Sequence, residues 1–432
     1  MPSDYSHAQG FLERLFRDHS REELLKRLEP SRESPASMVS SGARITPEIV
    51  ARRWKRLPLA LEVRDVLLEG VGPEGMAVYG RNIENYIGTV RMPLGLAGPL
   101  RVNGLFARGD YYLPLATTEA ALVASYHRGA CLLSLAGGCS AMLLAEGVSR
   151  SPGFAFPTAR QAGLFVAWVV DNLGSIRLAA ESTTRHGSLS DLRITIEGNH
   201  VYLLFEFQTG DASGQNMATI ACEAACARIV ELSPVKPDYY FIEANMSGDK
   251  KASAQSFMNV RGKKVTAEAI IPADLVEQTL HTTPLRMTDY WRMSAMGGVL
   301  SGTIGVQGHY ANGLAALFVA CGQDVACIAE SAVGVTRLEV QQNGALYATV
   351  TLPNLMVGTV GGGTALPTQR ACLELMGLCG EGKVRALAEV CAGLALAGEL
   401  SIVGALAAGE FTRAHKKLAR GKEKTEQGEN HD

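Results

Sequence analysis

The spacing of apolar and polar residues predicts a helical start to the chain. Residues 7–28 and 46–56 alternate charged and apolar positions with the period of a helix, and a linker rich in Ser and Pro separates them. We therefore expect residues 1–82 to form a small helical N-terminal domain. Gly and Pro then punctuate residues 92–104, which predicts a rigid loop that leads into a strand at 110–114.

Two later segments read as packed helices. From Thr117 the sequence TTEAALVASYHRGACLLSLAGG predicts a helix with Thr118 as its N-cap and Gly137 at its end. CAGLALAGELSIVGALAAGEF is strongly apolar but carries Glu399 and Glu410 within or beside it. It falls short of the roughly 18 uninterrupted apolar residues that suggest a membrane span, so we expect a buried helix.

Residues 151–246 form a pattern of their own. GFAFP predicts a strand, 158–173 a helix, RITIEGNHVYLLFEF two strands around a turn, GQNMATIACEAACARIVEL a helix and DYYFIEAN a last strand. The order βαββαβ is the ferredoxin-like arrangement. The predicted fold class is therefore α+β: a helical N-terminal segment, then a large α+β domain at 83–150 and 252–418 that this small domain interrupts. Residues 247–251 link the two domains, and the polar residues 419–432 are expected to be disordered.

Composition narrows the class of protein. The chain has 432 residues, of which 47% are hydrophobic and 19% charged, as in a globular protein. A net charge of -2 gives no electrostatic reason to expect nucleic acid or an anionic membrane as partner. The N-terminus is too charged for a signal peptide. The nine cysteines are odd in number and lack paired CxxC motifs, so we expect free thiols in a reducing cytoplasm and no metal site.

TGDASGQNM, residues 209–217, is a candidate cofactor loop. A strand runs into it and a helix follows, so small residues let backbone N–H groups and the positive helix end approach a phosphate. It is not the GxGxxG fingerprint of a Rossmann domain, and a plain strand-to-helix turn is the alternative. Arg185 precedes it and could pair with a 2′-phosphate, although surface arginines are common.

Two further motifs carry candidate chemistry. Asp249, Lys250 and Lys251 lie on a Gly/Ser loop, where a desolvated lysine could stabilise an oxyanion; a solvated charge cluster is the alternative. His309 and Asn312 lie one turn apart at a helix start and so share a face. Asp324 follows in apolar sequence, where we expect a buried carboxylate that needs a partner, either catalytic or in a structural ion pair or cap.

Other candidates are weaker alone. Glu119 follows paired threonines and could be an ordinary acid in the first turn of a helix. The glycines of VGTVGGGT, residues 357–364, allow close approach of a ligand or simply tight packing. His415 follows the last apolar helix among charged neighbours, where an exposed histidine is the default interpretation.

Taken together, these motifs resemble the 3-hydroxy-3-methylglutaryl-CoA reductase family, in the class typical of eukaryotes and archaea. The resemblance runs in order over about residues 75–420 and includes ENYIGTVRMPLGLAGPL, ATTEAALVASYHRG, TGDASGQNM, DKK, ACGQDVA, GTVGGGT and ELSIVGALAAGEFTRAH. It implies that Glu119, Lys250, Asp324 and His415 are the catalytic groups.

The resemblance also implies the reaction. Hydride addition to the thioester creates an oxyanion that Lys250 stabilises, while Asp324 holds the lysine and couples it to Glu119. Glu119 would supply protons, because two carboxyls in one network tend to keep one protonated. His415 would protonate the departing CoA thiolate. Two NADPH would be consumed for each mevalonate.

The implied binding residues fall into three sets. Arg185, which favours NADPH over NADH, joins the loop in a cofactor set: Arg185, Asp211, Ser213, Gly214, Gln215, Asn216 and Met217. Coenzyme A would contact Ser125, His127 and Arg128. The hydroxymethylglutaryl group would be held by Arg150, Asp249, Lys251, Arg292, His309 and Asn312. The family also implies a homodimer or homotetramer with active sites at the subunit interface.

Departures from the family pattern leave the substrate and the direction of the reaction open. Ser213 and Gln215 stand where methionines are usual, Glu243 replaces a serine that contacts substrate, and the segment around Arg292 is altered. These changes are compatible with a reductase of a related acyl-CoA thioester. Reverse NAD-dependent oxidation of mevalonate and a catalytically idle CoA-binding protein are also compatible with the sequence.

Overall fold

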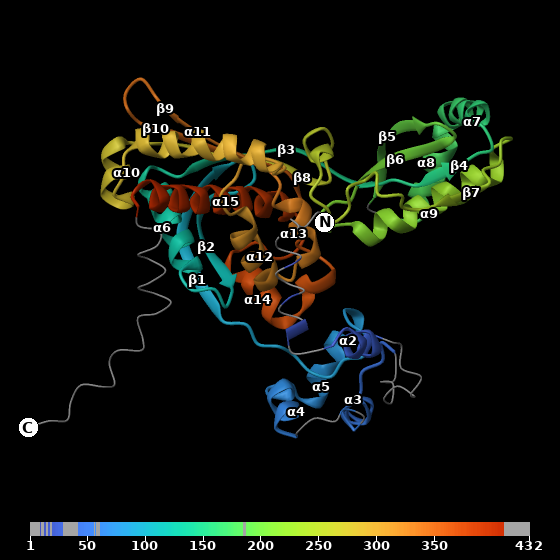
Figure 1. The fold of residues 1–432 in the computed structure, drawn as a ribbon, viewed down its shortest axis with the longest axis horizontal. Coiled ribbons are helices and arrows are strands. Elements are labelled where there is room, and N and C mark those ends of the chain that lie inside the picture. The colour runs from blue at the N-terminus through green and yellow to red at the C-terminus, as the bar shows by residue number, and fades with distance from the viewer. Residues whose placement is uncertain are drawn as a thin grey trace, which may run out of the picture. The chain divides into compact units, whose positions relative to one another are not determined.

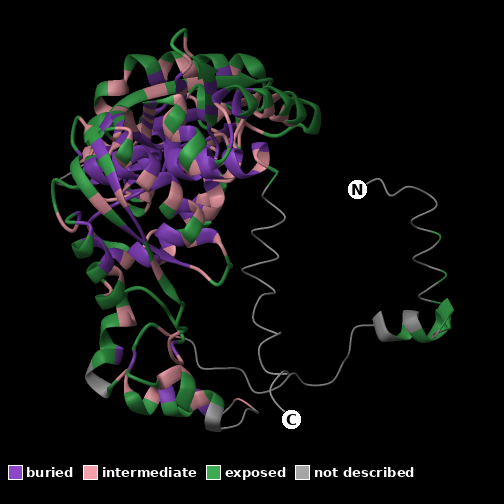
Figure 2. Cartoon of the chain, turned by 90° about the vertical axis from the view of Figure 1, so that its left-hand side faces the viewer, coloured by how far each residue is buried: buried purple, intermediate pink, exposed green. Residues whose placement is uncertain are grey.

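The computed structural model describes residues 9, 13, 16–17, 20–28, 42–55, 57, 61–184 and 187–409. Contacts divide the chain into two compact units, Met1–Thr89 and Val90–Asp432. The expected polar tail at 419–432 lies outside the described residues. Figure 2 shows that buried residues gather in the body of the larger unit.

The smaller unit is helical around a small core. Thr46 begins α3 by accepting a hydrogen bond from the Ile49 amide, which confirms the helix expected at 46–56. Buried Val50 and Trp54 of α3 pack with Met76 and Tyr86. The helices of this unit are α2 (Arg21–Leu28), α3 (Pro47–Trp54), α4 (Leu61–Leu68), α5 (Pro73–Met76) and the 3-10 helix η1 (Ala77–Arg81).

The larger unit is built on one ten-stranded mixed sheet. Its main path runs β7-β4-β6-β3-β8-β10-β9, with β5 beside β6 and the β1–β2 hairpin beside β3. The strands are β1 (Leu94–Gly104), β2 (Arg108–Ala116), β3 (Cys139–Arg150), β4 (Gly153–Ala155), β5 (Ser188–Glu197), β6 (His200–Gln208), β7 (Tyr239–Phe241), β8 (Gly262–Ile271), β9 (Val335–Val340) and β10 (Leu346–Leu355).

The prediction of a loop at 92–104 is wrong, because most of this segment is the strand β1. Its residues alternate in burial and pair antiparallel with β2. The register shifts between Ala97 and Leu100, and this irregularity accommodates Pro99, which has no N–H to donate. Gly and Pro therefore marked a bulge and not the end of a strand.

The segment from β4 to β7 follows the expected order βαββαβ. Its strands are antiparallel in the order β7-β4-β6-β5, and β5 and β6 meet at the predicted turn. The helix expected at 158–173 is α7 (Ala159–Asp171), and a further helix that was not predicted, α8 (Leu173–Glu181), follows it. The helix α9 spans Gln215–Leu232. The long strand β3 pairs with β8 through Ser140–Gly147 and with β6 through Val148–Arg150, so it connects this segment to the rest of the sheet (Figure 1).

Helices cover the other half of the sheet. The central one is α15, which packs on β8, β10, β3 and α6 (Figure 1). Of the described helices, α15 alone is long and apolar enough to cross a bilayer unbroken, but almost all of it is buried in the protein, as expected for a core helix. The helices of this half are α6 (Leu122–Leu135), α10 (Ala273–Leu280), α11 (Pro284–Ser301), α12 (Tyr310–Cys321), α13 (Ile328–Ser331), α14 (Pro367–Leu375), α15 (Val384–Ala407) and the 3-10 helices η2 (Ala254–Phe257), η3 (Val325–Cys327) and η4 (Gly362–Ala365).

The start of α6 also differs from the prediction. The helix begins at Leu122 after Ala121, whose φ of 70° is left-handed, so Thr118 is not its N-cap. Instead, Thr117 accepts a hydrogen bond from the Glu119 amide. Glu119 therefore lies on the turn before the helix and not within its first turn.

Candidate active site

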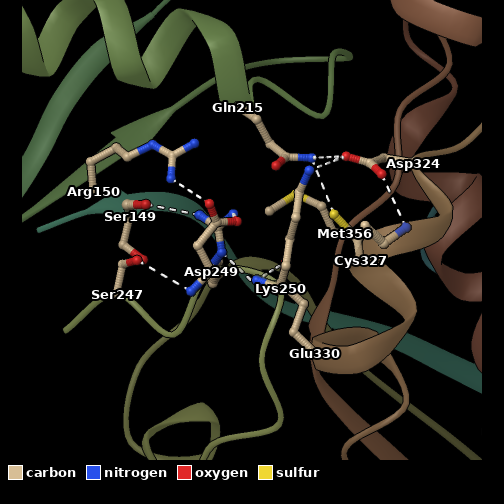
Figure 3. A network of polar contacts seen from close by, with 12 residues as sticks. Ser149, Arg150, Gln215, Ser247, Asp249, Lys250, Asp324, Cys327, Glu330 and Met356 are labelled. Carbon is tan, nitrogen blue, oxygen red and sulfur yellow. Dashed lines mark hydrogen bonds and ion pairs between the residues drawn. The ribbon is translucent and has the colours of Figure 1, made fainter. Parts of the chain in front are cut away.

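The Asp-Lys-Lys loop places a lysine against a carboxylate. Lys250 Nζ lies 2.8 Å from Asp324 Oδ2, and both side chains are about two-fifths exposed, at 40% and 38% (Figure 3). The prediction that Asp324 is buried is therefore wrong. Asp324 begins η3 and accepts a hydrogen bond from the Ala326 amide, which leaves its second oxygen for the lysine.

The pair is held in its charged form. The hydrogen bond and charge of Asp324 raise the pKa of Lys250. Burial alone would raise the pKa of Asp324, but the hydrogen bond and charge of Lys250 outweigh it, so the pKa is lowered. Gln215 Nε2 also donates to Asp324 Oδ2 at 3.3 Å and to Cys327 Sγ at 3.1 Å. The site thus presents an ammonium group at neutral pH.

Asp249 is clamped beside this lysine by two arginines. Arg150 Nη1 lies 2.6 Å from Asp249 Oδ2, and Arg261 binds Asp249 Oδ1. Arg150 also donates to Thr219 on α9, so it ties this helix to the loop. Burial by itself would raise the pKa of Asp249. The charge of Arg261 and the hydrogen bond from Arg150 outweigh burial, so the pKa of Asp249 is lowered. The carboxylate is therefore ionised at neutral pH.

A second group of candidates lines a pocket of about 470 Å³. Asn312 Nδ2 lies 3.3 Å from Glu119 Oε2, which brings the two residues together. Ser125 and Arg128 of α6 both hydrogen bond to Ser401 of α15. The candidate residues that line this pocket are Glu119, Ser125, Arg128, His309 and Asn312.

Comparison with known proteins identifies the family of the chain that carries these two clusters. The sequence model of hydroxymethylglutaryl-coenzyme A reductase matches residues 55–420. The chain belongs to the hydroxymethylglutaryl-coenzyme A reductase family.

Relatives and a solved structure agree with this assignment. The chain is 43% identical over 390 residues to the 3-hydroxy-3-methylglutaryl-coenzyme A reductase of Pyrococcus abyssi, covering 88% of this chain and 94% of the relative. The enzyme of that name from Aeropyrum pernix is 44% identical over 351 residues, covering 80% and 83%. A class II reductase from Streptococcus pneumoniae, bound to NADPH, has a TM-score of 0.61 at 21% identity, covering 90% of this chain and 98% of that one. At that identity the structural likeness shows the fold alone.

The loop that the family resemblance assigns to the cofactor precedes α9. Gly214 begins the helix with a left-handed φ of 74°, and an added Cβ would overlap the side chain of Thr209, so only glycine fits. The helix start has no side-chain cap. Met217 accepts a hydrogen bond from Thr184, while the Asp211 carboxylate accepts from the Gly382 and Val384 amides at the start of α15. Asp211 therefore stabilises the start of α15, independently of any ligand.

The remaining candidates make other contacts within a single chain. His127 is exposed and contacts Cys131 on its own helix. Lys251 Nζ donates to the carbonyl of Asp249, and Arg292 pairs with Asp289 at the surface. Between the described residues of one chain, no hydrogen bond or ion pair joins Glu119 to Lys250. Arg185 and His415 lie outside the described residues.

The sequence did not predict the contacts that three acids make at the site, the buried Glu399 and Glu330 and the partly buried Glu243. Glu399 accepts hydrogen bonds from the amides of Gly308 and His309 and from Thr336, so it holds the start of α12. Glu330 is fully buried and contacts the Asp-Lys-Lys loop. Glu243 accepts from Ser247 and lies 3.6 Å from Arg150. For Glu399 and Glu330, the only signal in the sequence is an acidic residue within an otherwise apolar segment.

Proposed function

We propose that this protein reduces the thioester of 3-hydroxy-3-methylglutaryl-CoA to mevalonate and free CoA, with two NADPH for each product. The observation that carries the proposal is the Lys250–Asp324 pair, an ammonium group at 2.8 Å from its carboxylate on a loop tied to α9 by Arg150. Membership of the reductase family supplies the substrate class.

Lys250 is the proposed oxyanion stabiliser. Bound NADPH supplies hydride, and addition to the thioester carbonyl leaves negative charge on oxygen, which a compact ammonium group stabilises. Asp324 orients that ammonium through its 2.8 Å contact and keeps it protonated. The same groups serve again when the aldehyde is reduced to the alcohol.

Residues 151–246 are the proposed cofactor domain, with a ferredoxin-like fold that interrupts the substrate domain of 83–150 and 252–418. The strand order β7-β4-β6-β5 supports the fold. The start of α9 suits an anionic cofactor because its first amides have no side-chain cap. We assign Asp211, Ser213, Asn216 and Met217 to this site.

The pocket of Glu119 is the proposed site of the acyl-CoA. Arg128 offers a cation, and Glu119 with Asn312 offers a proton source at the pocket wall. Because Glu119 and Lys250 belong to different clusters of one chain, we propose that the active site forms between subunits of a homodimer or homotetramer. The exposed apolar side chains of α11, Met293, Met296, Val299 and Leu300, support a second copy as partner.

The test follows NADPH absorbance with purified protein and several acyl-CoA thioesters. We expect hydroxymethylglutaryl-CoA to be turned over fastest, with mevalonate as product, and Lys250→Ala to lose nearly all turnover while NADPH still binds. Lys236→Ala, which removes an exposed lysine at the end of α9, is the matched control and should keep its activity. Faster turnover of another thioester, or a preference for NAD-dependent oxidation of mevalonate, would replace the proposal. Free cytoplasmic protein is the location that we propose, to be checked by cell fractionation.

A further inference from the structure

The backbone of Lys250 is held in an unfavourable conformation. Its φ is 55°, in the left-handed region that side-chain-bearing residues rarely adopt. Such conformations persist where surrounding contacts enforce them, often at functional sites. The contact here is a hydrogen bond of 3.3 Å from the Lys250 amide to Glu330 Oε1.

Glu330 is an unusual group to find at that position. It belongs to the short helix α13 and has no exposed surface. Its counter-charge is Arg261, 1% exposed, whose Nε donates to Glu330 Oε2 at 2.7 Å. Arg261 Nη1 donates to the Ser149 carbonyl at 2.8 Å, and Nη2 binds Asp249. One buried ion pair therefore holds both the side chain of Asp249 and the backbone of Lys250.

Stability alone does not account for this pair. Burying two charges is so unfavourable that well-packed apolar residues in their place are often as stable or more so. An apolar pair could not accept the Lys250 N–H or bind the Asp249 carboxylate. What the charges provide is a fixed loop, because Arg261 binds Glu330 and Asp249 on either side of Lys250 and is itself anchored to the Ser149 carbonyl of β3.

We infer that Glu330, with Arg261, is a positioning residue that sets the backbone of Lys250 so that its ammonium meets Asp324 and the substrate oxyanion. The inference rests on the proposed function, since it concerns the same lysine. Misplacement of a catalytic group by about 1 Å can lower the rate by roughly a hundredfold. Loss of Glu330 should therefore act mainly on kcat, because Glu330 lies beneath the loop and lines neither cluster that binds ligand.

The experiment compares Glu330→Gln with Glu389→Gln. Glu389 is a matched control because it is also fully buried and also accepts backbone amides, those of Phe106 and Ala107, which lie outside the Asp-Lys-Lys loop. We expect Glu330→Gln to lower kcat at least tenfold with little change in KM for NADPH, and Glu389→Gln to keep kcat within twofold of wild type.

A pH profile separates positioning from folding. If Lys250 leaves Asp324, that carboxyl loses the main partner that lowers its pKa. Among the described residues, Gln215 and the Ala326 amide still donate to it, and Cys327 lies against the same glutamine. In the pH profile of kcat, the limb on the acid side should then move to higher pH in Glu330→Gln. It should stay in place in Glu389→Gln. A variant that merely folded less well would lower the amount of active enzyme without moving the limb.

Two outcomes overturn the inference. One is a Glu330→Gln enzyme with wild-type kcat, and the other is equal loss in both variants with an unmoved acid limb. If Glu330→Gln does not fold, the double variant Glu330→Leu/Arg261→Met removes both charges together and should show the same fall in kcat. Turnover of hydroxymethylglutaryl-CoA by wild type and by Glu389→Gln tests the proposed function separately, so the two failures are distinguishable.

Discussion

At the scale of single residues, charge pairing decides how the site behaves. Lys250 and Asp324 keep each other ionised although both are partly exposed. Asp249 is less exposed and is bound by Arg150 and Arg261. Glu243, which replaces a serine in the family pattern, accepts hydrogen bonds from Ser247 and Asn245 and so shapes the same loop.

The substitution Asp249→Asn should lower the free energy of unfolding by an amount that depends on pH, because it removes the charge that pairs with the two arginines. The folded-state pKa of Asp249 lies below its ordinary value, so its ionised form stabilises the protein at neutral pH, and this contribution is lost as the pH falls through the folded pKa. We expect a loss of roughly 2 kcal/mol at pH 7, the scale of a hydrogen bond to a charged group. In urea unfolding, the gap between wild type and variant should narrow as the pH falls below about 5.

Asp110→Asn is the control, because Asp110 pairs with Arg101 at the surface and exposed pairs contribute little. A gap for Asp249→Asn that stayed constant from pH 7 to pH 3 would contradict the assignment.

At the scale of elements, close helix packing and helix ends determine the architecture around the pocket. Gly129 of α6 faces the backbone of α15, where an added Cβ would overlap the carbonyl of Ala397. Both helices line the pocket, through Ser125 and Arg128 on one side and Ile402 on the other. The shape of the pocket therefore depends on a glycine that does not line it.

Gly129→Ala should destabilise the protein by about 1–3 kcal/mol, because the two helices must move apart. Gly163→Ala on α7 is the matched substitution, since an added Cβ there meets nothing within 4 Å. It should stabilise by about 0.5–1 kcal/mol through helix propensity. Thermal unfolding of both variants checks the pair, and equal effects would refute the packing argument.

Asp211→Ala should loosen the start of α15. The carboxylate accepts from Gly382 and Val384 at 2.8 and 3.2 Å, so its loss should destabilise by about 1 kcal/mol, as for a helix cap. Hydrogen exchange should rise at those two amides first. Asp211→Asn keeps one acceptor oxygen and should show a smaller change; faster exchange throughout α15 without a local rise would count against this role.

At the scale of the whole molecule, the two candidate clusters explain why one chain is not the proposed unit of function. Glu119 with Asn312 and Lys250 with Asp324 each form a complete local contact. The last turns of α11 expose a stripe that includes Met293 and Leu300, 77% and 82% exposed. Apolar surface of this kind favours burial against another copy.

Met293→Glu/Leu300→Glu should therefore convert the proposed oligomer into monomers, because charges at an apolar interface are left without partners. Sedimentation velocity should show the smaller species, and turnover should fall while circular dichroism is unchanged. Val170→Glu/Leu178→Glu, on the exposed faces of α7 and α8, is the matched control and should leave both assembly and turnover as in wild type. An unaltered sedimentation coefficient for the α11 variant would remove this surface from consideration.

Local sequence was enough for several elements. Alternation and turn residues predicted β5 and β6, and the helical period of residues 46–56 predicted α3. The two acids within or beside an apolar run predicted that α15 is a core helix and not a membrane span. The family resemblance implied that Asp324 holds Lys250, and the 2.8 Å contact agrees, while the catalytic roles of both residues stay predictions. The predicted elements hold because helix and strand periods depend on neighbours a few positions apart.

Tertiary structure decided what depends on partners distant in the chain. The strand β1 exists because β2 pairs with it through the irregularity at Pro99, and the exposure of Asp324 follows from its place beside the loop of Lys250. Glu330 and Arg261 are 69 positions apart, and no local pattern predicts that they meet. Whether a buried charge finds its partner is a property of the packed chain, because only folding removes the water that would otherwise solvate both.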